Sequence, residues 1–417
     1  MKVLVIGSGG REHAIVWKLK QSAKVSRIYA APGNPGMASC AQIVPIKVDS
    51  LVELAEFARS EGIDLTVIGP EYPLSLGIVD HFREAGLRIF GPTKAAAQLE
   101  SSKAFAKEIM IEAGVLTSRH AVFEDREAAA QYLAKHGAPV VLKADGLAAG
   151  KGVFVCLDMK QAERALDEIY SSYEGTRLVI EDFLQGKEVS YIVATDGKNV
   201  VPLASSHDYK RALDGDQGPN TGGMGSVSPT PNMSASQEAE VIERVIEPVL
   251  AVMKRRGTPF SGFLYAGLML TESGIQVLEF NARLGDPETQ VILRRLRSDF
   301  FEVLYALSEP AGSDQVPPID WTSQSAVCVV LASEAYPAKP ITGDEITGIE
   351  AAEALEGVAV FHAGTALDGQ GRLVTAGGRV LNVTAVGNTL AEATLTVYRA
   401  CKLINFRGMQ HRSDIAK

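Results

Sequence analysis

The residue types best suited to chemistry are Glu279, Asn281 and Arg283, which alternate with apolar residues in the sequence LEFNAR at 278–283. Side chains of a β-strand point alternately to its two faces, so these three would share one face, while Leu278 and the other apolar residues enter the core. Mg²⁺ prefers oxygen ligands and retains waters and substrate phosphates. We therefore predict a metal site at Glu279 and Asn281, with Arg283 placed to stabilise charge on a transferred phosphoryl group.

Two further acids, Asp286 and Glu288, follow this strand in the sequence LGDPET at 284–289. So many acidic and amide side chains around Arg283 are unusual for a strand that is merely solvated. The alternative is an exposed strand whose charges form salt bridges. The segment as a whole indicates a nucleotide-dependent enzyme.

A glycine-rich loop, KADGLAAGKG at 143–152, lies between two predicted strands and carries lysines at both ends. Glycine lets the backbone approach phosphate oxygens, and Lys143 and Lys151 would supply positive charge. The loop is not a Walker A motif, because Gly152 stands where that motif requires Ser or Thr. The alternative is a hairpin with solvated lysines.

A short acidic segment, EDFL at 181–184, separates two more predicted strands, and Glu188 follows it. Such a connection can offer backbone N–H and C=O groups to the edge of an adenine and a carboxylate to ribose hydroxyls. An ordinary acidic turn is the competing interpretation.

The first glycine turn, GSGGREH at 7–13, lies between a buried strand and a helix. It fits a dinucleotide motif poorly, because Glu12 occupies the third glycine position and the second strand ends without an acid for a ribose. Backbone N–H groups at the helix N-terminus would instead bind a phosphate. A purely structural turn is the alternative.

A long loop at 207–225 is rich in glycine and charge. Long irregular loops inside compact domains are often functional, so we expect a substrate site here, against the alternative of a disordered surface loop. His207 by itself suits a hydrogen-bonded polar role better than catalysis.

The bulk composition sets broad limits. A chain of 417 residues should form two to four domains, and its net charge of −9 argues against a nucleic-acid partner. Four widely spaced cysteines indicate reduced thiols, and no apolar run is long enough to span a membrane. We therefore expect a cytoplasmic protein without a membrane partner.

Strands and helices alternate over the first 92 residues, which predicts a doubly wound α/β sheet. We then expect a connecting helix at 95–113 with Lys103 in its middle, and one long amphipathic helix at 236–256 that Pro248 kinks. Segments 263–270 and 276–281 should pair as a hairpin. Short strands joined by glycine after residue 326 indicate a β-rich C-terminal domain.

Together these segments resemble the ATP-grasp carboxylate–amine ligases, and most closely the glycinamide ribonucleotide synthetase family of purine biosynthesis. The resembling stretches span nearly the whole chain, and their combination is specific although each alone is not. They are GSGGREHA at 7–14, APGNPG at 31–36, GPE at 69–71, IFGPTKAAAQLESSKAFAKE at 89–108, LKADGLAAGKGV at 142–153, DQGPNTGGMG at 216–225, GFLYAGLM at 262–269, LEFNARLGDPETQ at 278–290, and VFHAGT with TAGGRVL in the last hundred residues.

The resemblance implies that ATP phosphorylates the carboxylate of glycine and that the amine of 5-phosphoribosylamine attacks the glycyl phosphate, with Mg²⁺ or Mn²⁺ as the metal. Positioning and charge stabilisation would supply most of the rate, without a protein nucleophile. It also implies a monomer with four parts: an N-terminal domain (1–100), a central ATP-grasp lobe (101–117 and 193–320), an ATP lid lobe (118–192) and a β-rich C-terminal domain (326–417).

The resemblance also assigns residues. Metal ligands would be Glu279 and Asn281, and catalytic residues Arg283, Lys143 and Asp208. ATP would be bound by Lys103, Lys143, Gly146, Gly150, Lys151, Gly152, Glu181, Leu184 and Glu188. Glycine and phosphoribosylamine would be bound by Gly9, Gly10, Arg11, Glu12, Asn34, Pro35, Gly36, Asp208, Lys210, Asn220, Thr221, Gly222, Gly223, Met224, Arg283 and Asp286.

Two features depart from the family pattern. Segment 263–270 has no carboxylate, whereas many ATP-grasp enzymes carry a metal ligand on that strand, and His207 stands where Gln is common. Three alternatives remain: another ATP-grasp ligase or a biotin carboxylase-like enzyme, a nucleotide-binding module without turnover, and a nicotinamide-dependent oxidoreductase.

Overall fold

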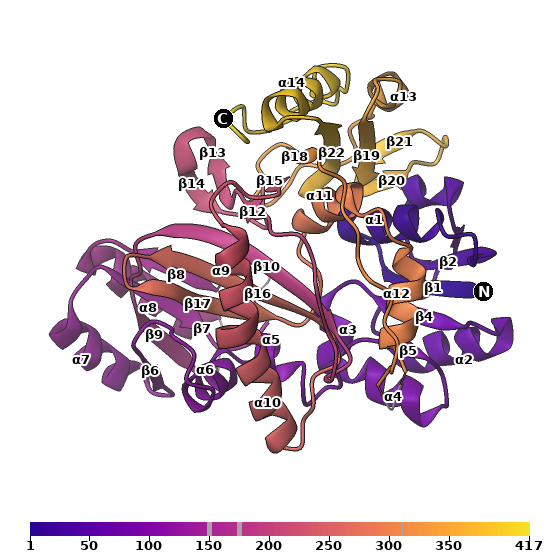
Figure 1. Ribbon diagram of the computed structural model, residues 1–417. Coiled ribbons are helices and arrows are strands. Elements are labelled where there is room, and N and C mark those ends of the chain that lie inside the picture. Colours follow the sequence, from indigo (N-terminus) through magenta and orange to yellow (C-terminus); the bar gives the residue numbers. More distant parts are fainter. Residues whose placement is uncertain (148–151, 173–176, 310–311) are drawn as a thin grey trace.

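The computed structural model describes residues 1–147, 152–172, 177–309 and 312–417. Its fold is mixed α/β, and the larger sheets lie in an N-terminal domain, a lid, a central lobe and a C-terminal domain (Figure 1). No helix within these ranges combines the length and apolarity that a bilayer crossing requires.

The N-terminal domain is a parallel sheet with strand order β3-β2-β1-β4-β5, as the alternating pattern predicted. Its strands are β1 (Lys2–Gly7), β2 (Arg27–Pro32), β3 (Gln42–Ile43), β4 (Leu65–Ile68) and β5 (Ile89–Phe90), and its helices are α1 (Gly10–Leu19), α2 (Leu51–Glu61), α3 (Glu71–Leu76) and α4 (Ile78–Glu84). The strand order reverses between β1 and β4. The carboxyl ends of these two strands are therefore the expected ligand-binding edge.

The connecting helix is interrupted, which corrects the single helix expected at 95–113. The structure has α5 (Gln98–Ser101) and α6 (Lys103–Glu112), with the extended residue Ser102 between them. The Ser102 hydroxyl accepts a hydrogen bond of 3.1 Å from the Phe105 amide and so caps α6. Lys103 is thus the first residue of a helix rather than a residue in its middle.

The lobe predicted to be the ATP lid, called the lid below, has an antiparallel sheet of order β6-β9-β7-β8 and lies on the left in Figure 1. Its strands are β6 (His120–Phe123), β7 (Val140–Ala144), β8 (Val153–Cys156) and β9 (Leu178–Asp182), and helices α7 (Arg126–His136) and α8 (Met159–Ser172) accompany them. Leu133, Leu142 and Leu166 are among the buried residues of its core. The glycine-rich loop connects β7 to β8, as predicted.

The central lobe has an antiparallel sheet of order β11-β10-β16-β17. Its strands are β10 (Lys187–Thr195), β11 (Val200–Pro202), β16 (Gly262–Thr271) and β17 (Gly274–Asn281). The predicted hairpin between β16 and β17 is confirmed. Helices α11 (Glu288–Arg295) and α12 (Phe300–Leu307) follow it.

The long helix predicted at 236–256 is divided into α9 (Ala235–Val241), a π-helical turn (Ile242–Ile246) and α10 (Glu247–Arg255). Pro248 lies in the first turn of α10 and has no N–H to continue the i→i−4 ladder. The Glu247 amide bonds to the Ile242 carbonyl, one residue further back than in an α-helix. The interruption predicted at Pro248 therefore takes the form of a π-helical turn just before the proline.

The C-terminal domain contains an antiparallel sheet of order β12-β15-β18-β22-β19. Its strands are β12 (His207–Asp208), β15 (Gly225–Ser228), β18 (Ser325–Ala332), β19 (Val358–His362) and β22 (Arg379–Gly387), and its helices are α13 (Ile349–Glu353) and α14 (Leu390–Cys401). Two small ribbons complete it: β13 (Arg211–Leu213) with β14 (Gln217–Asn220), and β20 (Thr365–Leu367) with β21 (Leu373–Thr375). Strands β12 and β15 flank the predicted substrate loop, so this loop is anchored in the C-terminal sheet.

Candidate active site

Strand β17 carries the predicted metal ligands. Gly267 on β16 pairs with Glu279, and Tyr265 pairs with Asn281. A β-bulge at Leu278 interrupts the pairing, and Leu278 lines a small polar cavity instead of joining the core with Phe280. The prediction that Leu278 faces the core is therefore wrong, because a bulge breaks the two-residue alternation.

Four cations, Lys210, Lys143, Lys103 and Arg283, act on the Glu279 carboxylate. Burial raises the pKa of Glu279, but these positive charges outweigh the burial, and the pKa lies below its usual value. Among the described residues, the Glu279 carboxylate forms no hydrogen bond or ion pair. An ionised oxygen ligand without a protein donor suits a divalent cation, and the surrounding cations suit phosphates.

Arg283 connects this strand to the N-terminal domain. Its guanidinium lies 2.8 Å from Glu100 and 3.1 Å from Glu71, and it donates a bond of 3.2 Å to the Asn281 amide oxygen. Burial lowers the pKa of Arg283, but Glu100 and Glu71 outweigh it, and the net shift is upward. Arg283 is therefore a fixed positive charge beside the two predicted metal ligands.

The Glu181 side chain lies at the centre of a buried charged cluster between the lid sheet and α6. Its carboxylate lies 2.9 Å from Lys143 and 3.0 Å from Lys107, and it accepts a hydrogen bond of 2.7 Å from Ser118. Burial raises the pKa of Glu181, but the two lysines outweigh it and lower the pKa to about 2. Sequence reasoning considered only backbone contacts of Glu181 and missed Lys107. The signal was available, because Lys107 follows Lys103 by four residues on one helix face.

Several of the other predicted ATP residues lie within the described part of the chain. Lys103 donates a hydrogen bond of 2.9 Å to the Gly146 carbonyl, so α6 contacts the start of the glycine-rich loop. Gly150 and Lys151 lie outside the described residues, while Gly152 is buried just before β8. Leu184 lies half-buried in the connection between β9 and β10.

A small cavity lies where strands β10, β16 and β17 meet the predicted substrate loop. Its walls include Glu188, Lys210, Asp208, Tyr265 and Leu278. Lys210 and Glu188 form an ion pair of 3.3 Å, and the charge of Glu188 raises the pKa of Lys210. Because Glu188 pairs with Lys210, a predicted ATP residue and a predicted substrate residue lie in one site.

Asp208 has an unusual environment in this cavity. Its enclosed position, and then the charge of Glu288, raise the pKa of Asp208 well above its usual range. Its Oδ1 atom is buried and has no hydrogen-bond partner among the described residues.

The Ser190 hydroxyl bridges the Tyr265 hydroxyl and the Glu288 carboxylate, at 2.8 and 3.1 Å. Sequence reasoning did not assign Ser190 or Tyr265 to the site.

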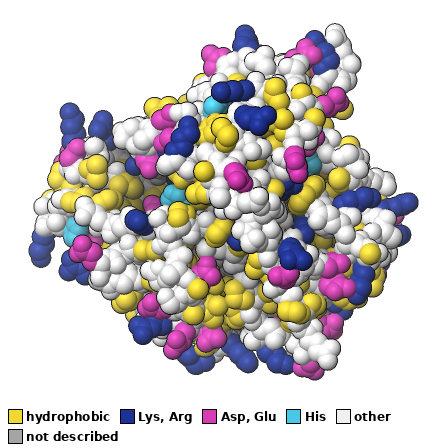
Figure 2. Space-filling view, turned by 45° about the horizontal axis from the view of Figure 1, so that its top comes forward, with side chains coloured by type: hydrophobic (Ala, Val, Ile, Leu, Met, Phe, Trp, Pro, Cys, Tyr) yellow, Lys and Arg dark blue, Asp and Glu magenta, His cyan; other side chains and the backbone are white. Residues whose placement is uncertain are grey.

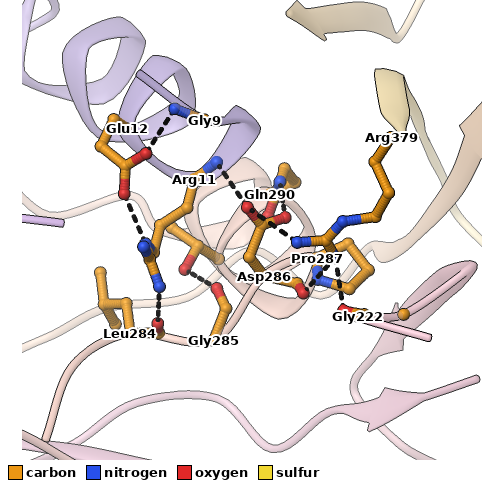
Figure 3. Close-up of polar contacts among 12 residues, drawn as sticks. Gly9, Arg11, Glu12, Gly222, Leu284, Gly285, Asp286, Pro287, Gln290 and Arg379 are labelled. Atoms are coloured by element: carbon orange, nitrogen blue, oxygen red, sulfur yellow. Dashed lines mark hydrogen bonds and ion pairs between the residues drawn. The ribbon is translucent and has the colours of Figure 1, made fainter. Parts of the chain in front are cut away.

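The N-terminus of α1 lies at the carboxyl end of β1, beside β4. Glu12 accepts a bond of 2.6 Å from the Gly9 amide and pairs with Arg11 at 2.6 Å, and Arg11 donates to the Leu284 carbonyl at 3.0 Å (Figure 3). The Arg11 amide points to Asp286 at 3.4 Å. Gly10 packs against Asn382 of the C-terminal domain. The structure thus brings the predicted residues 9–12 together with Asp286.

The 34–36 segment lies where the N-terminal and C-terminal domains meet. The Asn34 amide donates to the carbonyls of Ser8 and His362, both at 2.8 Å. Pro35 begins a short 3₁₀ helix (Pro35–Ser39), and Gly36 lies against His13 and His362. Asn34 therefore uses its amide to join two domains.

The substrate loop is held by Arg379 and Tyr336, two residues that the sequence analysis did not assign to the site. Arg379 donates hydrogen bonds to the carbonyls of Gly222 and Asp286 (Figure 3). The Gly222 amide donates to the Tyr336 hydroxyl at 3.0 Å. Asn220 ends β14, Thr221 caps the turn through its bond to the Lys210 carbonyl, and Met224 is buried. Gly223 lies against Asp208 and Pro287.

Comparisons with known proteins identify the family. The models of the phosphoribosylglycinamide synthetase N domain, ATP-grasp (A) domain and C domain match residues 1–100, 101–289 and 326–417. The phosphoribosylamine–glycine ligase of Neisseria meningitidis serogroup A is 49% identical over 421 residues, which cover 100% of this chain and 99% of that protein. That of Xanthomonas campestris is 48% identical, with 100% and 97% covered.

Solved structures agree. A phosphoribosylamine–glycine ligase of Thermotoga maritima has a TM-score of 0.85 at 35% identity, with 100% of both chains covered. A biotin carboxylase of Campylobacter jejuni has a TM-score of 0.74 at 17% identity, covering 98% of this chain and 92% of that one, and shares the fold. From its sequence matches and its ATP-grasp architecture, the chain belongs to the phosphoribosylglycinamide synthetase family.

Proposed function

We propose that this protein is an ATP-dependent ligase that joins glycine to 5-phosphoribosylamine through a glycyl phosphate, releasing ADP, phosphate and glycinamide ribonucleotide for purine biosynthesis. The observation that carries the mechanism is the ionised Glu279 carboxylate among Lys103, Lys143, Lys210 and Arg283. This arrangement suits a triphosphate and its metal. The proposed reaction needs no protein nucleophile, because positioning and charge stabilisation supply most of the rate.

Glu279 and Asn281 are the proposed ligands of Mg²⁺ or Mn²⁺. The donor set fits, because both side chains offer oxygen, and Asn281 already presents its oxygen to the Arg283 cation. Gly267, opposite Glu279, supplies no third ligand from β16. The metal would neutralise charge on the phosphates, while Arg283 and Lys143 hold positive charge on either side.

The two other substrates are proposed to bind between the domains. The α1 N-terminus and Arg11 suit the phosphate of phosphoribosylamine. Asp208, Lys210 and the 220–224 segment would bind the amine and glycine, because they line or adjoin the cavity next to Glu188. Residues 118–192 would close on ATP and exclude water from the acyl phosphate.

We also propose that the enzyme acts as a cytoplasmic monomer with the four domains expected from its sequence. Acidic and basic side chains are interspersed over the face shown in Figure 2. This mixture, with a net charge of −9, does not favour a polyanionic partner.

The test is a coupled assay of ADP release with phosphoribosylamine generated in situ. We expect release only when ATP, glycine and phosphoribosylamine are all present, together with formation of glycinamide ribonucleotide. ADP release that requires bicarbonate instead of glycine would establish the biotin carboxylase-like alternative. ATP binding without turnover in either mixture would contradict both activities.

A further inference from the structure

One arginine of the C-terminal domain extends into the substrate region. Arg379 begins β22 and directs its guanidinium between Gly222 and Asp286 (Figure 3). It donates to the Gly222 carbonyl and to the Asp286 carbonyl, the latter at 2.6 Å, and lies 3.5 Å from the Asp286 carboxylate. A guanidinium offers five donors in a rigid plane, so a single side chain fixes both segments.

We propose that Arg379 is a positioning residue for the phosphoribosylamine site, an inference that rests on the proposed function. Gly222 is held at both of its peptide groups by the C-terminal domain, because its amide donates to Tyr336 while its carbonyl accepts from Arg379. Tyr336 packs directly on Gly378, where a Cβ would clash with the ring. Gly378 thus leaves room for the Tyr336 ring, whose hydroxyl accepts the bond from the Gly222 amide.

Through Gly222 and Asp286, Arg379 is connected to both parts of the proposed site. On one side, Gly223 follows Gly222, adopts φ +110°, and lies against Asp208 in the cavity wall. On the other side, Asp286 accepts from the Arg11 amide at 3.4 Å and from Gln290 at 2.8 Å. Arg379 therefore couples the substrate loop to the helix N-terminus proposed to bind phosphate.

The lysines at the proposed ATP phosphate site are held by other contacts, which do not involve Arg379. Lys143 and Lys107 bond to Glu181, and Lys103 bonds to Gly146, all on α6 or the lid. Loss of Arg379 should therefore release the loop and Asp286 while these lysine contacts with Glu181 and Gly146 stay in place. This separation distinguishes a positioning role from a general loss of structure.

The experiment compares Arg379→Met, Arg379→Lys and Tyr336→Phe with wild type by steady-state kinetics for each substrate. We expect Arg379→Met to raise the apparent KM for phosphoribosylamine by about tenfold or more and to change the KM for ATP by less than about twofold. Arg379→Lys should give an intermediate value, because an ammonium keeps the charge but loses the planar fork. Tyr336→Phe should raise the same KM by about threefold.

The matched control is Arg372→Met, which removes an exposed arginine of the same domain that pairs with Asp368. It should leave every KM unchanged. An unchanged KM for phosphoribosylamine in Arg379→Met and Tyr336→Phe, or an equal rise in the KM for ATP, would overturn the positioning role. If Arg379→Met does not fold, Tyr336→Phe alone decides the question. Wild-type enzyme that needs no phosphoribosylamine would instead overturn the proposed function itself.

Discussion

Lys143 on β7 and Glu181 on β9 form a buried ion pair of 2.9 Å within the sheet of the lid. The second oxygen of Glu181 lies 3.0 Å from Lys107 on α6, so one carboxylate joins the lid sheet to the central lobe. Two lysines share one glutamate. The cluster of Lys107, Lys143 and Glu181 therefore retains a net positive charge at the position proposed for the nucleotide.

Lys107→Met should destabilise the protein and weaken ATP binding. Removing the sole partner of a buried charge costs about 3–5 kcal/mol, and we expect a smaller loss here because Glu181 keeps its ion pair with Lys143. Glu181 would then bind Lys143 more strongly and withdraw it from the phosphates. Urea denaturation should show the loss of stability, and the apparent KM for ATP should rise by about fivefold or more.

The control for that variant is Lys135→Met, because Lys135 is an exposed lysine on α7 of the same lid. It should change neither the free energy of unfolding nor the KM for ATP. A Lys107→Met protein as stable as wild type would contradict the stabilising role of the Lys107–Glu181 ion pair.

Glu279→Gln should remove most turnover and leave the fold intact. The substitution keeps the shape of the side chain but replaces an ionised ligand with a neutral amide, which binds a divalent cation more weakly. We expect kcat to fall by about 100-fold or more, as for loss of a transition-state contact worth several kcal/mol. Steady-state assays and thermal melting, in which Tm should stay within about 2 °C, test this.

Glu272→Gln is the matched control, since Glu272 is exposed in the turn of the same hairpin. It should keep wild-type activity. Retained activity in Glu279→Gln would refute the metal role of Glu279.

Much of the fold was accessible from local sequence patterns. The β16–β17 hairpin followed from a two-residue alternation around Ser273-Gly274, and the parallel N-terminal sheet followed from buried apolar runs separated by helices. These features depend on neighbours in sequence. The break at Ser102 was missed because helical periodicity continues on both sides of it, and only the cap geometry reveals the interruption.

The site was less accessible, because several of its contacts join distant segments. Arg379 and Asp286 are separated by 93 residues, and no local pattern predicts their meeting. Leu278 was assigned to the wrong side since a bulge depends on the pairing of two strands. The assignment of Glu279 and Asn281 as metal ligands rests on residue type and spacing, and it stays a prediction.

Gly267→Ala should weaken the response to the divalent cation. A Cβ at this position would lie 3.2 Å from the Glu279 Cγ, which is tight enough to displace the side chain by a few tenths of an ångström. Because ligand geometry is strict for Mg²⁺, we expect the Mg²⁺ concentration for half-maximal rate to rise by about threefold or more at fixed ATP. Titration of activity with Mg²⁺ measures this shift.

Gly369→Ala supplies the comparison, because a Cβ on Gly369 meets no atom within 4 Å. An unchanged Mg²⁺ titration in Gly267→Ala would show that Glu279 does not need its present position.

Acid should destabilise the contact between the N-terminal and C-terminal domains through His13 and His362. Burial, and then the charge of His362, lower the pKa of His13 to about 3, and burial lowers the pKa of His362 to about 4. The His13 ring accepts a bond of 2.8 Å from the His362 amide, which requires an unprotonated nitrogen. Because both folded-state pKa values lie below the unfolded value of 6.5, their stabilisation is present above pH 6.5 and is lost as the pH falls toward 4 and 3.

The free energy of unfolding should therefore fall by up to about 1.4 kcal/mol per pH unit for each histidine below pH 6.5. Urea denaturation between pH 7 and 5 measures this slope in wild type, in His13→Gln and in the double variant with His362→Gln. Glutamine in place of His13 can still accept from the amide but does not titrate, so each substitution should remove one histidine's share of the slope. Equal slopes in all three proteins would show that these two buried rings do not govern the acid sensitivity of the domain contact.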